Sequence, residues 1–187
     1  MKVLVYGSRL FGGVIRCLVE DAGHQFAGFI DDVHEGQDVL GPFEATRLTH
    51  PPPEYACVNA VGYSDLGARR AVSARIEAAG YPMPALVHPR ASVSTTSSVG
   101  AGAFVMAGAL VDCHVAIGAG VVIWPGACVS HDCTIGANTF LSPNCTVCGD
   151  CHVGESCFVG AGAVIVSHAV VADGSRIKAL ERYVDGR

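Results

Sequence analysis

Residues 121–160 read VVIWPGACVSHDCTIGANTFLSPNCTVCGDCHVGESCFVG, and a branched aliphatic residue returns at every sixth position of this stretch. The same step runs without a break from Val87 to Ile177, and a second register of mostly small residues runs four positions later. Internal repeats of this kind take precedence over every other sequence signal. The aliphatic positions are Val87, Val93, Val99, Val105, Val111, Ile117, Ile123, Val129, Ile135, Leu141, Val147, Val153, Val159, Ile165, Val171 and Ile177. The small positions are Ala91, Ser97, Ala103, Ala109, Val115, Val121, Ala127, Cys133, Thr139, Cys145, Cys151, Cys157, Ala163, Ala169 and Ser175.

The repeat predicts a parallel β-helix with three short strands per coil and eighteen residues per turn. One aliphatic side chain of each hexad points inward, and the small residue fills the crowded corner. Fifteen hexads make about five coils, and neighbouring coils pair through backbone hydrogen bonds about 4.8 Å apart. Glycines recur directly after the aliphatic position, where we expect them to serve tight turns. They are Gly100, Gly118, Gly136, Gly154 and Gly160.

Residues 1–84 do not follow this register and predict a separate domain. Lys2–Tyr6 is a short apolar strand that ends in the glycine-containing turn Gly7–Gly13, and the helix that follows stops at Gly23. The turn lacks the G-x-G-x-x-G pattern, so a phosphate site at the helix N-terminus and an ordinary βα turn both stay open. The apolar face of the helix carries Val14, Ile15, Leu18 and Val19.

Two more strands and a second helix complete this domain. Phe26–Ile30 is a strand that is closed by Asp31 and Asp32, Tyr55–Val61 is a third strand, and Ser64–Ala79 is a helix. Strand, glycine turn, helix, strand and an acidic end predict a small Rossmann-like βαβ unit. The predicted fold class is therefore an α/β unit followed by a β-helix of about five coils.

The composition limits the classes of function. The chain has 187 residues, half of them apolar, and a net charge of −5. This acidic balance offers no basic face for nucleic acid and no polybasic patch for a membrane. The opening MKVLVYGSRLFGG has too short an apolar run for a signal peptide, and no stretch reaches the length of a membrane span. With nine cysteines and no export signal, we expect free thiols and a cytoplasmic location.

The cysteine run C-x2-C-x2-C, formed by Cys145, Cys148 and Cys151, begins like an iron–sulfur motif. The hexad register favours another interpretation, because Cys145 and Cys151 fall in the small inward column together with Cys133 and Cys157. A cysteine in such a column acts as a compact hydrophobic residue. Cys148 lies in a different column. We therefore expect no metal, and thiols that are dispensable for catalysis.

Six short segments carry a family resemblance. They are Tyr6-Gly7-Ser8, Phe29-Ile30-Asp31-Asp32, Ala60-Val61-Gly62, Leu86-Val87-His88-Pro89, Val129-Ser130-His131-Asp132-Cys133 and Gly149–Gly162. With a βαβ unit placed directly before a β-helix, the chain resembles the sugar acyltransferases of the left-handed β-helix (hexapeptide-repeat) superfamily. These include sialic acid O-acetyltransferases and N-acetyltransferases of nucleotide-linked 4-amino sugars, such as the bacillosamine pathway enzyme. The resemblance implies an acceptor-binding domain over residues 1–84, a left-handed β-helix acyltransferase domain over 85–180, a tail over 181–187 and a homotrimer.

The resemblance also implies that His131 is the general base and that Asp132 supports it. The chemistry agrees, because an amine or hydroxyl that attacks a thioester must lose a proton, and neutral imidazole accepts one near neutral pH. A neighbouring carboxylate stabilises the imidazolium that forms. The acyl group would pass directly from the donor to the acceptor, so no cysteine nucleophile is needed.

The eighteen-residue step adds a geometric expectation, since residues one coil apart stack on the same face. It places Gly149 directly above His131 and Cys113 directly below. A glycine beside the base leaves room for a thioester, and its N–H is able to donate to the carbonyl oxygen. In the adjacent column, a histidine–aspartate pair and a plain polar ladder both stay open. That column holds His114, Asp132, Asp150 and His168.

By resemblance, the acyl donor is acetyl-CoA and the acceptor is a nucleotide-linked amino sugar. The nucleotide-sugar N-acetyltransferases usually carry histidine where this chain has Phe11 and Phe140, which implies a less polar acceptor pocket. The residues assigned to acetyl-CoA are Gly149, Ala161 and Ala179. The residues assigned to the acceptor are Gly7, Ser8, Arg9, Phe11, Asp31, Asp32 and Phe140.

Three other functions are alternatives to this one. An O-acetyltransferase that acts on a hydroxyl of sialic acid or another sugar is the main alternative. A zinc enzyme of the γ-carbonic anhydrase kind is disfavoured, because no two of the eight histidines lie within five residues of each other. A non-catalytic trimeric β-helix protein is the third.

Overall fold

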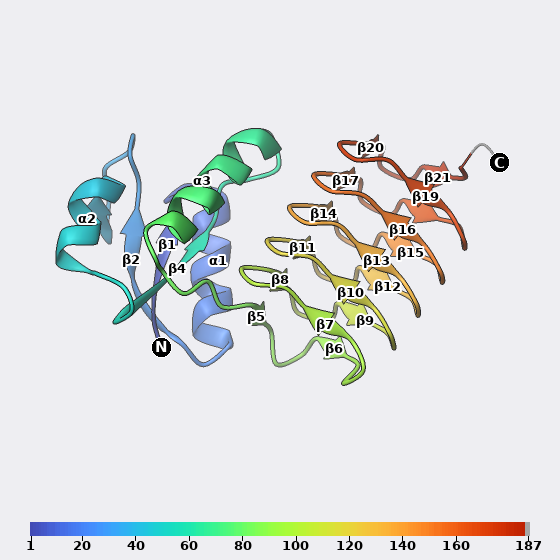
Figure 1. Ribbon diagram of the computed structural model, residues 1–187, viewed down its shortest axis with the longest axis horizontal. Coiled ribbons are helices and arrows are strands. Elements are labelled where there is room, and N and C mark those ends of the chain that lie inside the picture. Colours follow the sequence, from blue (N-terminus) through green and yellow to red (C-terminus); the bar gives the residue numbers. More distant parts are fainter. Residues whose placement is uncertain (186–187) are drawn as a thin grey trace. The chain divides into compact units, whose positions relative to one another are not determined.

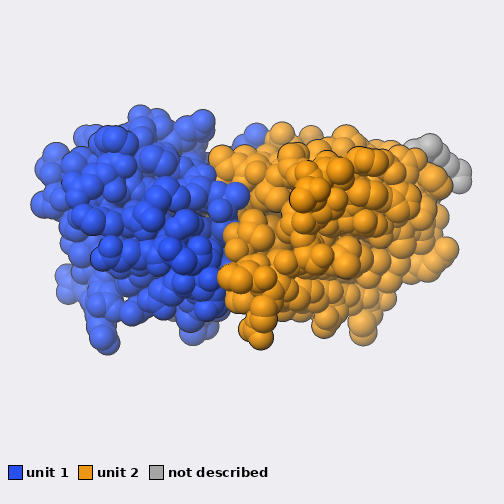
Figure 2. Space-filling view, turned by 90° about the horizontal axis from the view of Figure 1, so that it is seen from below, with its two compact units in different colours: residues 1–86 blue, residues 87–187 orange. Residues whose placement is uncertain are grey.

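The computed structural model describes residues 1–185 of the chain. The chain divides into two compact units, residues 1–86 and 87–187, which Figure 2 colours separately. The helices and longer strands lie in the first unit, and short repeated strands make up the second (Figure 1). Among the described residues, no helix has the length and apolar character that crossing a membrane requires.

The first unit contains a four-stranded parallel sheet with the strand order β3-β2-β1-β4. Because parallel neighbours need a crossover connection, α1 joins β1 to β2. The strands are β1 (Lys2–Tyr6), β2 (Gln25–Ile30), β3 (Val39–Gly41) and β4 (Tyr55–Asn59), and the helices are α1 (Leu10–Asp21), α2 (Phe43–Thr49) and α3 (Leu66–Ala78). Their buried core comprises Leu4, Tyr6, Ile30, Phe43, Cys57, Ile76 and Tyr81.

The predictions for β1, β2, β4, α1 and α3 are confirmed, with small shifts at their ends. The third predicted strand, β4, ends two residues early at Asn59. The second predicted helix, α3, begins at Leu66 because the Asp65 side chain accepts the Ala68 N–H at 2.8 Å and caps the helix. Val14 was expected on the buried face of α1, but it is 39% exposed. Sequence reasoning missed β3 and α2, which have only three and seven residues and therefore show no clear periodicity.

The second unit is a β-solenoid of about five coils, whose strands form three parallel sheets. Each strand spans two residues, and every strand from β5 to β20 ends at one of the predicted aliphatic positions, so the repeat prediction is confirmed. The strands are β5 (Leu86–Val87), β6 (Ser92–Val93), β7 (Ser98–Val99), β8 (Phe104–Val105), β9 (Leu110–Val111), β10 (Ala116–Ile117), β11 (Val122–Ile123), β12 (Cys128–Val129), β13 (Thr134–Ile135), β14 (Phe140–Leu141), β15 (Thr146–Val147), β16 (His152–Val153), β17 (Phe158–Val159), β18 (Val164–Ile165), β19 (Val170–Val171), β20 (Arg176–Ile177) and β21 (Arg182–Tyr183).

The last strand, β21, lies in the stretch 181–187 that was expected to be a tail. It pairs with β18 and so continues one sheet of the solenoid. Residues 186–187, the rest of that stretch, lie outside the described residues.

The turns of the solenoid share one backbone feature. Every sixth residue from position 102 to position 180 has a positive φ, and eight of these fourteen residues are not glycine. The glycines that directly follow the aliphatic positions stand at the start of such turns: the Gly100 carbonyl accepts the Ala103 N–H at 3.2 Å, and the Gly160 carbonyl accepts the Ala163 N–H at 3.1 Å. A Cβ at Gly100 would lie 2.6 Å from the backbone N of Ala119 in the next coil. These glycines are needed where neighbouring coils approach closely.

The small inward column packs the centre of the solenoid, and its polar members also bind the next coil. The hydroxyl of Thr139 donates to the carbonyl of Gly154 at 2.9 Å and accepts the N–H of Cys157 at 3.0 Å. All nine cysteines of the chain are free thiols. The four in this column are at most 2% exposed, as the register predicted; they are Cys133, Cys145, Cys151 and Cys157.

Candidate active site

The turn between β12 and β13 carries the predicted base. His131 Nδ1 lies 2.8 Å from Asp132 Oδ2, and both side chains are about half exposed, at 56% and 53%. Asp132 has a φ of 59°, the left-handed conformation that all turns of this column share. Aspartate tolerates this conformation better than most residues. The turn therefore directs the carboxylate of one residue at the ring of the residue before it.

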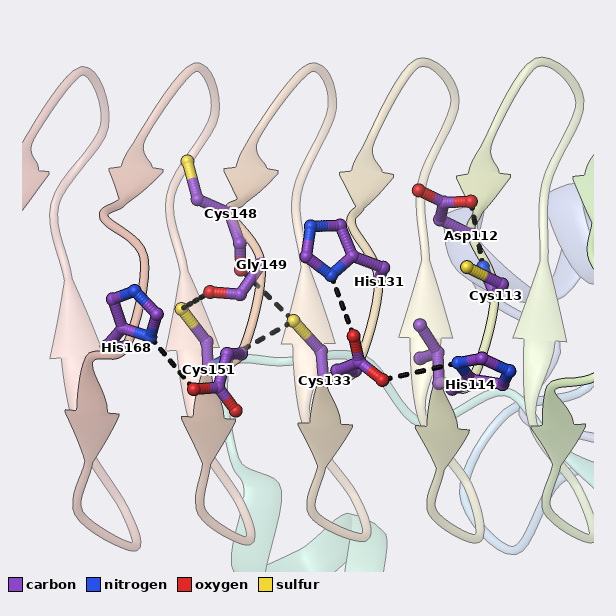
Figure 3. A network of polar contacts seen from close by, with 12 residues as sticks. Asp112, Cys113, His114, His131, Cys133, Cys148, Gly149, Cys151 and His168 are labelled. Carbon is purple, nitrogen blue, oxygen red and sulfur yellow. Dashed lines mark hydrogen bonds and ion pairs between the residues drawn. The ribbon is translucent and has the colours of Figure 1, made fainter.

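A second histidine contacts the same carboxylate from the neighbouring coil. His114 Nδ1 lies 3.3 Å from Asp132 Oδ1, so the two oxygens of one aspartate face two imidazoles (Figure 3). One coil further on, His168 Nδ1 lies 2.8 Å from Asp150 Oδ2. The question that the sequence left open is thus answered: this column contains histidine–aspartate pairs.

The hydrogen bond between His131 and Asp132 shifts the pKa of both groups. It raises the pKa of His131 above its ordinary value, and it lowers the pKa of the Asp132 carboxyl. When Nδ1–H donates to the carboxylate, the neutral ring carries its free lone pair on Nε2. The pair can therefore accept a proton at Nε2 and stabilise the resulting imidazolium.

Gly149 lies against the ring of His131, as the eighteen-residue step predicted. The Asp150 N–H donates to the His131 carbonyl at 3.0 Å, and the Asp132 N–H donates to the Cys113 carbonyl at 3.0 Å, which fixes the register of the three coils. A Cβ at Gly149 would lie 2.6 Å from both Cε1 and Nε2 of His131. Even a methyl group at this position would therefore meet the imidazole.

The two polar groups of the Gly149 backbone differ in their hydrogen bonding. Its carbonyl accepts the His168 N–H at 3.1 Å, whereas its N–H has no acceptor within residues 1–185. An unpaired N–H beside the free nitrogen of an imidazole is able to bind the carbonyl oxygen of an acyl group.

The structure does not place Ala161 and Ala179 beside Gly149. Gly149 lies in the turn between β15 and β16, whereas Ala161 lies between β17 and β18, at another corner of the solenoid. Ala179 stacks on Ala161, whose carbonyl accepts the Leu180 N–H at 2.9 Å. Ser167 is the residue that continues the column of Gly149, and the eighteen-residue step alone would have found it.

In the first unit, the carboxylate of Asp31 is occupied by the protein's own donors. It accepts the Ser8 N–H at 3.0 Å, the Ser8 hydroxyl at 2.6 Å, the Val33 N–H at 3.0 Å and the His34 N–H at 2.9 Å. Burial opposes ionisation, but these hydrogen bonds outweigh it and hold the pKa of Asp31 well below its usual range. Asp31 thus joins the turn after β1 to the loop after β2.

Asp32 is also bound to groups of the protein. One carboxylate oxygen accepts the Phe43 N–H at the start of α2 at 2.8 Å, and the other contacts the Tyr6 hydroxyl and lies 2.6 Å from Arg75 Nη1. Burial acts to raise the pKa of Asp32, yet the bonds from Tyr6, Phe43 and Arg75 lower it. The same arginine binds Glu44 at 3.0 Å. Nothing in the sequence distinguished Arg75 from the other charged residues on α3.

A cavity of about 500 Å³ opens beside these aspartates and is lined by residues 31–36 and 39–42. Gly7, Ser8 and Arg9 lie in the turn before α1, and Arg9 Nη1 lies 2.8 Å from His34 Nε2, a residue of the cavity wall. Of the two phenylalanines, Phe11 is half-buried on α1 and Phe140 is fully buried in β14. Among residues 1–185, no three histidine, cysteine or acidic side chains are grouped so that they could hold a metal ion.

The second unit matches a family of known sequence. The model of the bacterial transferase hexapeptide family, with six repeats, matches residues 114–149 and 132–167. No curated protein sequence matches the chain. Over residues 114–167 the chain is therefore similar to bacterial hexapeptide-repeat transferases.

Solved structures extend this similarity to nearly the whole chain. The acetyltransferase domain of PglB from Neisseria gonorrhoeae is 29% identical, with a TM-score of 0.88, and the match covers 99% of this chain and 94% of that one. The same domain in complex with acetyl coenzyme A is matched at 28% identity and a TM-score of 0.89, over 98% and 90% of the two chains. PerB from Caulobacter crescentus, solved with CoA and GDP-perosamine, shares the fold at 23% identity and a TM-score of 0.81, over 100% and 98%.

These matches confirm the resemblance to sugar acyltransferases of the left-handed β-helix superfamily. They also confirm the predicted enzyme class, an acetyl-CoA-dependent acyltransferase of the hexapeptide-repeat type.

Proposed function

We propose that this protein transfers an acetyl group from acetyl-CoA to the amine of a nucleotide-linked amino sugar, with His131 as the general base. The observation that carries the proposal is the position of the His131–Asp132 pair, with its free Nε2, against Gly149, whose N–H has no acceptor within residues 1–185. A base and an oxyanion donor at one spot suit an attack on a thioester.

In this proposal each group of the second unit has a separate task. His131 Nε2 takes the proton of the attacking amine, and Asp132 stabilises the imidazolium through Nδ1. The Gly149 N–H holds the carbonyl oxygen, on which negative charge develops. Acetyl-CoA supplies the activated acetyl group, and the missing side chain at Gly149 suits a substrate that must approach the imidazole closely. Ala161 and Ala179 remain proposed contacts of acetyl-CoA.

The first unit is proposed to be a Rossmann-like domain that binds the acceptor. Its strand order β3-β2-β1-β4 supports this, since open sheets of that kind bind ligands beyond the carboxyl ends of their strands. The 500 Å³ cavity lies after β2, and Gly7, Ser8 and Arg9 follow β1. Phe11 would offer an apolar face to the sugar. The left-handed coil and the homotrimer are carried by the resemblance, and together with the cytoplasmic location they belong to the same proposal.

The test is release of the CoA thiol from acetyl-CoA with a panel of acceptors: nucleotide-linked 4-amino sugars, the corresponding free amino sugars, and sialic acid. Mass spectrometry before and after mild alkali distinguishes amides from esters. We expect the highest kcat/KM with a nucleotide-linked amino sugar and an alkali-stable product. Preferential esterification of sialic acid would replace the proposal with the O-acetyltransferase, and no turnover with any acceptor would contradict it.

A further inference from the structure

The buried thiol of Cys133 contacts the turn that carries Gly149. Cys133 is 1% exposed and lies in the small inward column, two residues after His131. Its Sγ donates to the carbonyl of Cys148 at 3.1 Å and accepts the N–H of Cys151 at 3.4 Å. These two backbone groups flank Gly149, so a single side chain holds both ends of its turn (Figure 3).

One of these bonds acts on the Gly149 N–H itself. The carbonyl of Cys148 and the N–H of Gly149 belong to the same peptide group, and in a trans peptide the two point in opposite directions. Among the described residues, the only cis peptide is Pro52-Pro53, so this one is trans. Because the carbonyl is directed inward to a buried sulfur, the N–H is directed out of the coil, where it has no acceptor within residues 1–185.

We infer that Cys133 is a positioning residue for acyl transfer: its thiol fixes the peptide plane that presents the Gly149 N–H to the thioester carbonyl. This inference rests on the function proposed above. It gives the cysteine of the Ser-His-Asp-Cys run a task other than that of a nucleophile, a metal ligand or a plain filler.

The chemistry of the site suits this task. Burial raises the pKa of the Cys133 thiol to about 11, so it stays protonated and keeps its donor at neutral pH. A donor is not needed at this position for the coil to form, because Val115 occupies the same column one coil earlier and is 2% exposed. Valine is therefore a replacement that the column accommodates and that removes the donor.

The test compares two valine substitutions. Cys133→Val removes the bond to the Cys148 carbonyl. Cys157→Val removes an equivalent bond, in which Sγ of another buried column member donates to the Ala172 carbonyl at 3.2 Å, in a turn away from Gly149. We expect Cys133→Val to lower kcat/KM for acetyl-CoA about five- to tenfold, as loss of one hydrogen bond implies, and Cys157→Val to change it less than about twofold. Cys133→Ser, which restores a donor, should recover most of the loss.

Two readouts separate positioning from general damage. The fall should be mainly in kcat, because the bond to the carbonyl oxygen strengthens as charge develops on it. The acid limb of the pH–rate profile should stay in place, since the His131–Asp132 pair is untouched. Equal losses in the two valine variants would overturn the inference. If Cys133→Val fails to fold, Cys133→Ser is compared with Cys133→Ala, and equal activities there would overturn it as well. Absence of acetyl-CoA-dependent turnover in the wild-type protein would contradict the proposed function itself. Equal losses in the two valine variants would contradict only the role of Cys133, so the two failures are distinguishable.

Discussion

Asp31 in the first unit, expected to bind the acceptor, and Asp132 in the second, expected to support the base, have different surroundings. Asp31 is 9% exposed and accepts backbone and hydroxyl donors from two loops. Asp132 is 53% exposed and contacts the imidazoles of His114 and His131. Asp31 also contacts one imidazole, with His34 Nδ1 3.1 Å from its Oδ1, but most of its partners are backbone and hydroxyl donors, whereas both partners of Asp132 are imidazoles. A carboxylate held mainly by fixed backbone and hydroxyl donors serves the fold, and one whose partners are both imidazoles is able to serve proton transfer.

The comparison is tested most severely by removing the base. We expect His131→Ala to lower kcat by two or more orders of magnitude, since general bases contribute about 10²–10⁴. Steady-state kinetics with acetyl-CoA and the acceptor measure this. His168→Ala is the matched control, because His168 Nδ1 also lies 2.8 Å from an aspartate oxygen, that of Asp150 on the preceding coil. It should leave kcat unchanged. A near-normal rate in His131→Ala would show that neither His131 nor its partner Asp132 takes part in catalysis.

The same substitution at both aspartates tests the comparison directly. Asp31→Asn replaces one acceptor oxygen by an amide that faces N–H donors, and we expect it to lower the free energy of unfolding by about 2–3 kcal/mol. Asp132→Asn should change that free energy by less than about 0.5 kcal/mol, because the side chain is exposed and asparagine tolerates a positive φ. Urea denaturation measures both. Equal effects on stability would show that the two carboxylates do not differ in the way described.

Gly149→Ala tests the contact on the other side of the base. The added Cβ would meet the imidazole, which is exposed and free to turn away. Turning away breaks the bond to Asp132, so we expect kcat/KM to fall about tenfold or more while the melting temperature is preserved. Ser167→Ala, in the same column one coil further on, is the control and should be silent. Wild-type activity in Gly149→Ala would refute the close contact between glycine and base.

The solenoid was predictable from the sequence because one side chain per hexad had to be aliphatic, and this requirement is local. The same step of eighteen residues placed Gly149 beside His131, since stacking follows from the repeat. The βαβ unit was predicted only where its elements were long. Val39–Gly41 and Phe43–Thr49 were missed, although Pro42 and Glu44 are typical of a helix start.

The chemistry of individual side chains was less predictable, because it depends on backbone groups far away in the sequence. Cys133 binds a carbonyl fifteen residues on, and nothing in its own neighbourhood distinguishes it from a filler. The donors to Asp31 come from two loops, and the Arg75 contact to Asp32 spans 43 residues. These distances are set only once the coils and the sheet have formed.

The role of His131 is tested most directly by its own titration. Only the neutral ring accepts a proton, so activity should be lost as the pH falls through the pKa of His131, which the bond to Asp132 raises. We propose to follow the His131 ring by NMR in the wild type and in Asp132→Asn, and to measure the pH dependence of kcat/KM for both. We expect the ring titration and the acid limb to coincide in each protein and to move together to lower pH in Asp132→Asn. An acid limb that stays in place while the His131 titration moves would contradict its assignment as the base.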